Sequence, residues 1–261
     1  MKKLAPVMLC ISVCITISVL CPGQATCEET LEICNCETGV LNLVLSSTGE
    51  ETTITLDDLI EECAADAEKT NDFKKCVSQL TKTWNQDGLI DNNQSKTIKS
   101  CSKKFTPVKT VKYVDVVQYL GLWYQIASYI NPNIGDLAGV TAEYSLNQDG
   151  TVKVLNNGII GGLDGSPVMI EGVARVVDEQ TNAKLAVSFP DFGITQESEY
   201  WIIELAEDYS YAVVTNSNRT SLFILNRTPT MEDSLYQDII YRLVMQCFVP
   251  AEIIRTLQPE E

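Results

Sequence analysis

The second half of the chain alternates apolar and polar side chains in short, regular runs. Val140, Ala142 and Tyr144 alternate with Thr141 and Glu143, which is the period of two that a half-buried strand requires. Comparable segments, each bounded by turn residues, cover residues 122–129, 152–154, 168–177, 184–189, 200–205, 211–215 and 222–225. The pattern predicts eight strands, and a closed barrel of that size can hold one small ligand.

Turns and one helix complete this second unit. Residues 156–158 (Asn-Asn-Gly) predict a loosening of the third strand, and the glycine-rich residues 161–165 predict a loop. Residues 231–233 open a helix for which Thr230 is the expected cap. The helix ends near Cys247, and residues 253–257 predict a short final strand. The buried face of the predicted helix, at helical spacing, comprises Leu235, Tyr236, Ile239, Ile240 and Leu243.

The first half carries helical periodicity instead. Thr55 and Asp58 form a capping pattern that opens a helix through about residue 69, and Asp91 with Gln94 forms a similar pattern for a later helix. Between them, Asn71 is the expected cap of a helix with apolar residues Phe73, Val77, Leu80 and Trp84. We therefore predict a small helical domain over residues 26–104, a solvated linker over 105–113 and a barrel domain over 114–261.

Residues 83–94 are partly similar to a calcium-binding loop. Gly88 and Ile90 stand where such a loop needs a glycine and an apolar residue. Thr83 replaces the aspartate of the first position, however, and Gln94 replaces the bidentate glutamate of the last. Because the two missing carboxylates would supply most of the charge that holds the ion, an ordinary helix–turn–helix is favoured and no metal site is expected.

The amino terminus predicts secretion. Lys2 and Lys3 precede an apolar stretch over residues 4–20, and residues 23–25 (Gly-Gln-Ala) form a small-residue cleavage site; together these are typical of a signal peptide over residues 1–25. Acidic residues after Cys27 disfavour a membrane anchor, and the residues before Cys21 and Cys27 disfavour a lipidated cysteine. The expected location is secreted, extracellular or periplasmic, with membrane association left open.

Seven cysteines follow residue 25, which in a secreted chain is typical of a disulfide framework. The sequence does not define their pairing. Within one chain, Cys247 can bond only to the amino-terminal domain, and we expect that bond; a buried thiol and a bond between two chains are the alternatives. The set is Cys27, Cys34, Cys36, Cys63, Cys76, Cys101 and Cys247.

Charge and composition exclude several functions. The chain has 19 basic and 35 acidic residues, a formal net charge of −16, so the chain as a whole is expected to repel anionic lipid surfaces, and a nucleic-acid partner is not expected. It contains no histidine, which excludes imidazole catalysis and histidine metal sites. Ser188 and Ser198 therefore have no histidine to activate them, and no catalytic residue is identified. Residues 93–95, 218–220 and 226–228 match the glycan acceptor pattern.

Three motifs occur in order at barrel spacing in the second half. They are Gly121 and Trp123 at the start of a strand, residues 207–209 (Glu-Asp-Tyr) before another, and residues 222–230, which contain Arg227, at the end of a third. Over about residues 114–258 they resemble the lipocalins, in particular the bacterial outer-membrane lipocalins, plant temperature-induced lipocalins and apolipoprotein D. The cysteine-rich region before them has no such resemblance.

The resemblance implies an all-β fold: an eight-stranded antiparallel up-and-down barrel with a helix against its outside. It also implies that Arg227 stacks across Trp123 and closes the barrel floor, where Asn226 would be hindered as a glycan acceptor. The implied function is transport or storage of a small hydrophobic ligand, such as a fatty acid, a lysophospholipid or a similar lipid, with no cofactor and no enzymatic activity.

Candidate ligand-binding residues are the apolar side chains at alternate strand positions, which would line the interior of the barrel. They are Val140, Ala142, Tyr144, Val152, Val154, Leu185, Val187, Phe189, Tyr200, Ile202, Tyr211 and Val213.

Two other functions stay open. One is an enzyme acting on a carotenoid or lipid, because the domain order is similar to that of violaxanthin de-epoxidases. The other is an extracellular interaction module that uses the helical domain.

Overall fold

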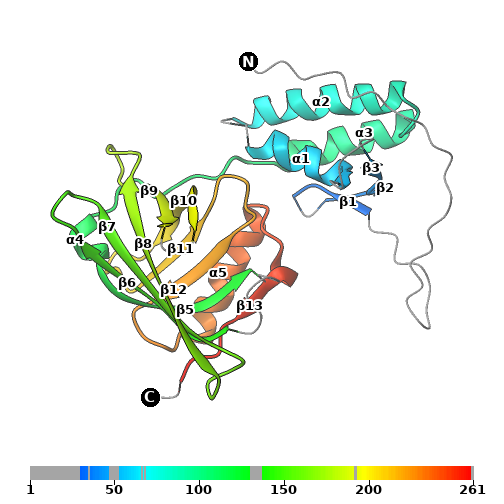
Figure 1. Ribbon diagram of the computed structural model, residues 1–261. Helices are drawn as coiled ribbons and strands as arrows, with labels where there is room; N and C mark the ends of the chain where they lie inside the picture. The colour runs from blue at the N-terminus through cyan, green and yellow to red at the C-terminus, as the bar shows by residue number, and fades with distance from the viewer. Residues whose placement is uncertain are drawn as a thin grey trace. The chain divides into compact units, whose positions relative to one another are not determined.

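The computed structural model describes residues 30–34, 36–46, 53–65, 67, 69–129, 137–190 and 193–259. The chain divides into two compact units, with the boundary between residues 107 and 108 (Figure 1). The predicted signal peptide and Cys27 lie outside the described residues. None of the helices in the described ranges is both long enough and apolar enough to cross a membrane.

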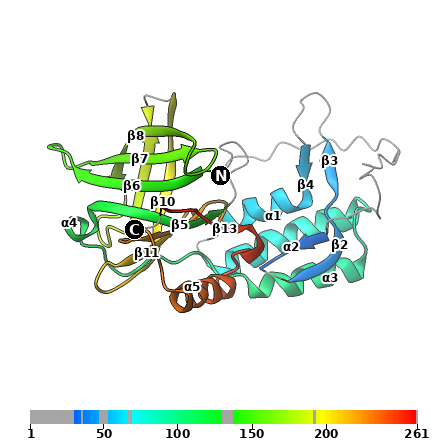
Figure 2. The same cartoon turned by 90° about the horizontal axis from the view of Figure 1, so that it is seen from below.

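The first unit, in its described residues, contains three helices and four short strands (Figure 2). The helices are α1 (Leu56–Ala65), α2 (Thr70–Gln86) and α3 (Asn92–Cys101), and the 3-10 helix η1 (Ser102–Lys104) follows. Strand β1 (Thr30–Glu32) pairs with β2 (Glu37–Leu41), and β3 (Val44–Ser46) pairs with β4 (Thr53–Thr55). The sequence pattern predicted the helices but missed these strands, which are too short to establish a period of two.

Capping side chains start two of these helices. The carboxylate of Asp91 accepts hydrogen bonds from the backbone N–H groups of Asn93 and Gln94, and the Gln94 side chain accepts one from the Asp91 N–H at 2.7 Å, which is a complete capping box. At α1, the Asp58 carboxylate accepts from the Thr55 N–H and hydroxyl. The predicted cap of α2 is wrong, because Asn71 lies inside the helix and Lys69 precedes it without a side-chain bond.

An apolar core and disulfides connect the elements of this unit. Phe73, Val77 and Trp84 of α2 are buried together with Ile98 of α3. Disulfides join Cys36 to Cys101 and Cys63 to Cys76, and Cys34 is also disulfide-bonded. Phe105 belongs to the same core, with its ring centroid 3.9 Å from that of Phe73. The first residue of the predicted linker is therefore part of the folded unit.

The second unit is a closed antiparallel barrel (Figure 1). Helix α4 (Val116–Tyr119) precedes it, and neighbouring strands pair in chain order. Strand β12 then pairs with β5, with Phe223 opposite Ser128, which closes the circle of eight. The predicted fold class is confirmed. The strands are β5 (Gly121–Tyr129), β6 (Leu137–Leu146), β7 (Val152–Ile160), β8 (Ser166–Val176), β9 (Lys184–Phe189), β10 (Ile194–Leu205), β11 (Tyr211–Thr215) and β12 (Leu222–Asn226).

Strand β7 runs through the residues that were expected to loosen it. Asn156 pairs with Ala142 on one side and Ile170 on the other, and Asn157 and Gly158 stay in register with β8. Hydrogen bonding to two neighbouring strands thus outweighs the weak strand preference of Asn and Gly. The strand is therefore not interrupted, and the wall is longer than the sequence pattern indicated. The predicted loosening is found only in the pairing with β6, which has an irregularity between Ala138 and Thr141, opposite Gly158.

Helix α5 (Asp233–Met245) covers the outside of the barrel, and η3 (Pro250–Glu252) leads from it to β13 (Ile253–Arg255), which pairs with β5 (Figure 1). The buried face of α5 consists of Tyr236, Ile239 and Leu243, as predicted. Thr230 is not its cap: Glu232 holds that position without a side-chain bond, and the Thr230 carbonyl accepts instead from the Asn226 amide.

Cys247, just after α5, is disulfide-bonded, so it is not the buried free thiol that the sequence left open. The bond from Cys247 to the amino-terminal domain stays a prediction.

Candidate ligand-binding site

The barrel has two apolar clusters, one inside it and one between its wall and α5. The sequence-predicted lining residues that belong to the interior cluster are Tyr144, Val152, Val154, Val187 and Ile202, with Ala142, Leu185, Phe189 and Tyr200 partly buried against it. Val140 lies beside Gly158 on the same inner face, since a Cβ atom on Gly158 would be 3.6 Å from Cγ2 of Val140. Most of the predicted set is therefore brought together.

The orientation expected for β11 is reversed. Tyr211 and Val213 belong to the outer cluster with α5, whereas Ala212 and Val214 belong to the interior cluster. The predicted parity failed because β11 is apolar on both faces, one toward the barrel interior and one toward the helix. A strand that is buried on both sides carries no alternation from which to choose.

Trp123 and Arg227 form the floor of the barrel. Trp123 is fully buried, and its indole N–H donates to the Tyr119 carbonyl at 2.8 Å. The Arg227 guanidinium lies over the indole, 3.7 Å from the ring centroid, a cation–π contact. Gly121 has φ +92°, and a Cβ atom there would come 3.5 Å from the guanidinium, so the strand turns here at a residue that suits the left-handed region.

Every nitrogen of the Arg227 guanidinium is engaged by backbone carbonyls. Its Nε donates to Tyr209, and its terminal nitrogens donate to Leu122, Gln118 and Tyr119 at 2.8–3.3 Å. Burial lowers the pKa of the guanidinium below its ordinary value. Arg227 therefore ties α4 to the barrel floor, and four of its five N–H donors are committed there.

Away from this floor, inward-facing side chains are accessible. Phe223 and Ile254 are 38% and 51% exposed, and both pair with Ser128 on the inner face, five residues beyond Trp123 along β5. On β10, the inward-facing Ser198 pairs with Val187 and is exposed. Apolar surface inside a closed wall that water can reach is the feature that a hydrophobic ligand requires.

Three tyrosine hydroxyls form a hydrogen-bonded network inside the barrel. The Tyr200 hydroxyl lies 2.8 Å from that of Tyr119 and 3.0 Å from that of Tyr144. Burial raises the pKa of Tyr144 to about 12 and that of Tyr119 and Tyr200 well above the ordinary range. All three hydroxyls therefore keep their protons at neutral pH and are available as hydrogen-bond donors.

A buried amide oxygen lies on the same inner face as this network. Asn156 is on the inner face of β7, because it follows Val152 and Val154 at the same parity and pairs with Ala142. Its Oδ1 is buried and has no hydrogen-bond partner in the described residues. Since Val154 pairs with Tyr144, Asn156 is a diagonal neighbour of Tyr144 across the strand pair, which places their Cα atoms about 7–8 Å apart.

Gly172 of β8 gives space to an aromatic ring of the inner wall. A Cβ atom on Gly172 would lie 2.6 and 2.7 Å from two ring carbons of Phe189 and 2.7 Å from the Ser188 carbonyl oxygen. The Phe189 ring therefore lies directly over the Gly172 backbone.

Sequence reasoning missed Tyr119, Asn156 and Gly172. Continuing the alternation of Val152 and Val154 by one step would have identified Asn156 as inward-facing.

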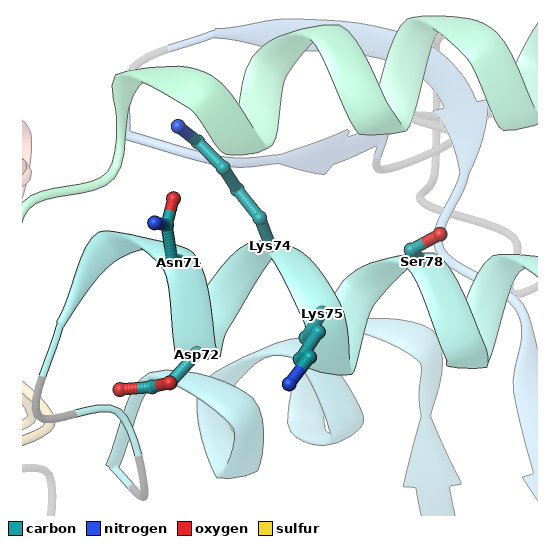
Figure 3. A pocket seen from close by; sticks show the side chains of 5 residues that line it. All are labelled: Asn71, Asp72, Lys74, Lys75 and Ser78. Atoms are coloured by element: carbon teal, nitrogen blue, oxygen red, sulfur yellow. The ribbon is translucent and has the colours of Figure 1, made fainter.

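A different surface depression lies in the first unit. Asn71, Asp72, Lys74, Lys75 and Ser78, all on α2, line it. Lys74 extends toward α3, whereas Lys75 points to the opposite side of the helix (Figure 3). Its lining is polar and comes from one helix, so it lacks the enclosing apolar walls of a ligand site, and the barrel interior is the better candidate.

Comparison with known proteins places the barrel in a family. A family model described as a lipocalin-like domain matches residues 114–258. Temperature-induced lipocalin-1 of Arabidopsis thaliana is 34% identical over 161 residues, covering 59% of this chain and 84% of that protein. The outer membrane lipoprotein Blc of Escherichia coli strain K12 is 35% identical over 164 residues, covering 61% and 89%. The solved structure of insecticyanin from Manduca sexta is 16% identical, with a TM-score of 0.47 and coverage of 60% and 87%.

Proposed function

We propose, because this chain belongs to the lipocalin family, that its barrel carries a small hydrophobic ligand for transport or storage, in the class of fatty acids, lysophospholipids and similar lipids. The accessible apolar inner wall is the observation that carries the proposal: Phe223 and Ile254 face inward and yet stay 38% and 51% exposed. Burying such surface contributes about 25 cal/mol per Å² of area removed from water, less the cost of ordering the ligand.

Native mass spectrometry of the purified chain, followed by organic extraction, tests this proposal. A carrier retains one intact hydrophobic molecule per barrel, and the extract identifies it. The enzyme alternative instead predicts conversion of an added carotenoid or lipid under turnover. The interaction-module alternative predicts no retained molecule and no uptake of a neutral fluorescent probe, and that result would contradict the carrier function.

We also propose that the first unit supports peripheral association with anionic membranes. Residues 69–107 of this unit contain eight lysines and three aspartates, a net of +5, whereas the rest of the chain has 11 basic and 32 acidic residues. Lys96, Lys99 and Lys103 line one shallow depression along α3 and η1, together with Thr97 and Ser100. Each lysine near an anionic surface contributes about 1 kcal/mol, and charges beyond about 8 Å are largely screened at physiological ionic strength, so a local basic face can act within an acidic chain.

Vesicle co-sedimentation tests the membrane proposal. The full chain should bind phosphatidylserine-containing vesicles more than pure phosphatidylcholine vesicles, and replacement of Lys96, Lys99 and Lys103 by glutamine should remove that difference. Lys153→Gln is the matched control, because Lys153 is an exposed barrel lysine paired with Glu171 at 2.8 Å. Equal binding by the triple variant and the wild-type chain would contradict the assignment of this face.

A further inference from the structure

The inner wall of the barrel combines uncharged side chains with a few polar groups. None of the strand positions that the pairing places on the inner face, among the described residues, carries a charged side chain. The charged pairs Lys153–Glu171 and Arg175–Glu197 lie on outward-facing strand positions, and Glu204 faces outward toward Arg242 of α5. The polar capacity of the interior therefore consists of hydroxyl and amide groups.

The tyrosine network has more donors than it uses. Three phenols supply three O–H donors, and the network contains two hydrogen bonds, Tyr119 to Tyr200 and Tyr144 to Tyr200. At least one O–H therefore has no acceptor within the network. The buried Asn156 Oδ1 is the converse case, an acceptor without a donor. A buried polar atom without a partner is unfavourable, so both groups favour a molecule that supplies the missing bonds.

From these unsatisfied groups we infer that the barrel binds its ligand with a neutral polar end directed inward, toward Tyr200 and Asn156, and that this end both donates and accepts hydrogen bonds. A hydroxyl group meets the requirement: its hydrogen is donated to the Asn156 Oδ1, and its oxygen accepts the spare phenol O–H. The ligand class is therefore a hydrophobic alcohol, such as a long-chain alcohol or a sterol. This inference rests on the proposed carrier function and narrows it.

An ionised carboxylate does not fit this end of the site. It accepts hydrogen bonds but donates none, so it would leave the Asn156 oxygen unpaired in the amide orientation that the structure shows. Its charge would also be desolvated without a cation that is free to form a bidentate pair, because four of the five N–H donors of Arg227 are committed to backbone carbonyls of the floor. A fatty-acid anion would have to bind with its carboxylate toward the open end instead.

Displacement of a neutral fluorescent probe, N-phenyl-1-naphthylamine, tests the inference on the delipidated full chain at pH 8. Three competitors share one hydrocarbon chain and differ at its end: oleyl alcohol, oleate and cis-9-octadecene (octadecene below). One or two added hydrogen bonds of about 1 kcal/mol each should make the alcohol displace the probe at about fivefold to thirtyfold lower concentration than octadecene. Oleate should gain no comparable advantage over octadecene.

Two variants locate the effect, and a third serves as a control. Tyr200→Phe and Asn156→Leu keep the size of each side chain and should each reduce the preference for the alcohol over octadecene. Tyr124→Phe should leave that preference unchanged, because Tyr124 belongs to the outer cluster against α5. Thermal melts of all variants establish that they are folded.

The possible results distinguish a failure of the inferred alcohol preference from a failure of the proposed carrier function. If alcohol and octadecene compete equally in the wild-type chain, or if Tyr200→Phe and Asn156→Leu both keep the full preference, the inference is wrong and the carrier function stands. If the delipidated chain takes up neither the probe nor any of the competitors, the carrier function fails, and the inference fails with it.

Discussion

Replacing Gly172 by alanine adds one methyl group at a point where the inner wall has no space for it. The new Cβ would come within 2.6 Å of a Phe189 ring carbon and 2.7 Å of the Ser188 carbonyl oxygen. The ring could turn away, but the carbonyl belongs to the backbone of the adjacent strand and cannot. We therefore expect Gly172→Ala to distort the β8–β9 pairing and to displace Phe189 within the interior.

The expected size of the effect comes from two opposing terms. Overpacking a tight interior costs about 1–3 kcal/mol. Alanine also restricts the unfolded chain more than glycine does, which stabilises the fold by about 0.4–1 kcal/mol where the backbone permits it. The net destabilisation is about 1–2 kcal/mol, a fall in melting temperature of about 2–8 °C for a unit of this size. Probe affinity should fall as well, since Phe189 lines the interior.

The melt should be followed by near-ultraviolet circular dichroism, because the two units can unfold separately and the barrel contains the buried Trp123 and tyrosine network. Gly158→Ala is the matched control: it lies on the inner face of β7, and the nearest atom to its Cβ, at 3.3 Å, is the mobile Cδ2 of Leu137. It should lose less than half as much stability. A Gly172→Ala barrel that melts at or above the wild-type temperature would refute the reasoning.

Three further predictions concern the floor and the interior. Trp123→Ala should destabilise the barrel by about 3–5 kcal/mol, measured by chemical denaturation; a variant that melts like the parent and loses only ligand would contradict its assignment to the floor. Val187→Asp, at a side chain 8% exposed in the interior cluster, should abolish probe uptake in a folded variant because an unpaired carboxylate is disfavoured there, and undiminished affinity would place Val187 outside the site. The pKa of Tyr144, raised by burial to about 12, gives a pH prediction: above pH 10 the unfolded chain releases this proton while the folded chain keeps it, so stability falls by about 1.4 kcal/mol per pH unit up to pH 12, and Tyr144→Phe should show a slope shallower by that amount.

The fold of the barrel could be predicted because its strands are half-buried and its motifs occur in order. Val140, Ala142 and Tyr144 alternate with polar residues, and that alternation alone defines a strand and its inner face. The same reasoning failed at β11, where Val213 is as apolar as its neighbours because α5 buries the other side. Which face of a doubly buried strand points inward depends on register, and register is a property of the closed sheet.

Apolar residues do not mark the polar part of the site, and Asn156 is found only when the alternation of Val152 and Val154 is continued by one step. Asn156 stands in an Asn-Asn-Gly triplet that is typical of a turn, yet it faces the interior because both neighbouring strands continue past it. The network of Tyr119, Tyr144 and Tyr200 joins a helix and two strands separated by up to 81 residues. Only the closed barrel brings these hydroxyls together.

Closure of the wall has a consequence for the order in which the barrel can form. Strand β5 pairs with β12 about a hundred residues later, and β13 and the residues after it fill the remaining edge: Gly139 donates to the Leu257 carbonyl, and the Gln258 amide donates to the carbonyls of Gln125 and Val140. During synthesis, β5 emerges early and must wait with an unpaired edge until residues 222–258 follow. Contacts so distant in sequence slow folding, and an exposed strand edge invites pairing with other chains. The growing chain is therefore most exposed to aggregation after β5 has been synthesised and before residues 222–258 follow.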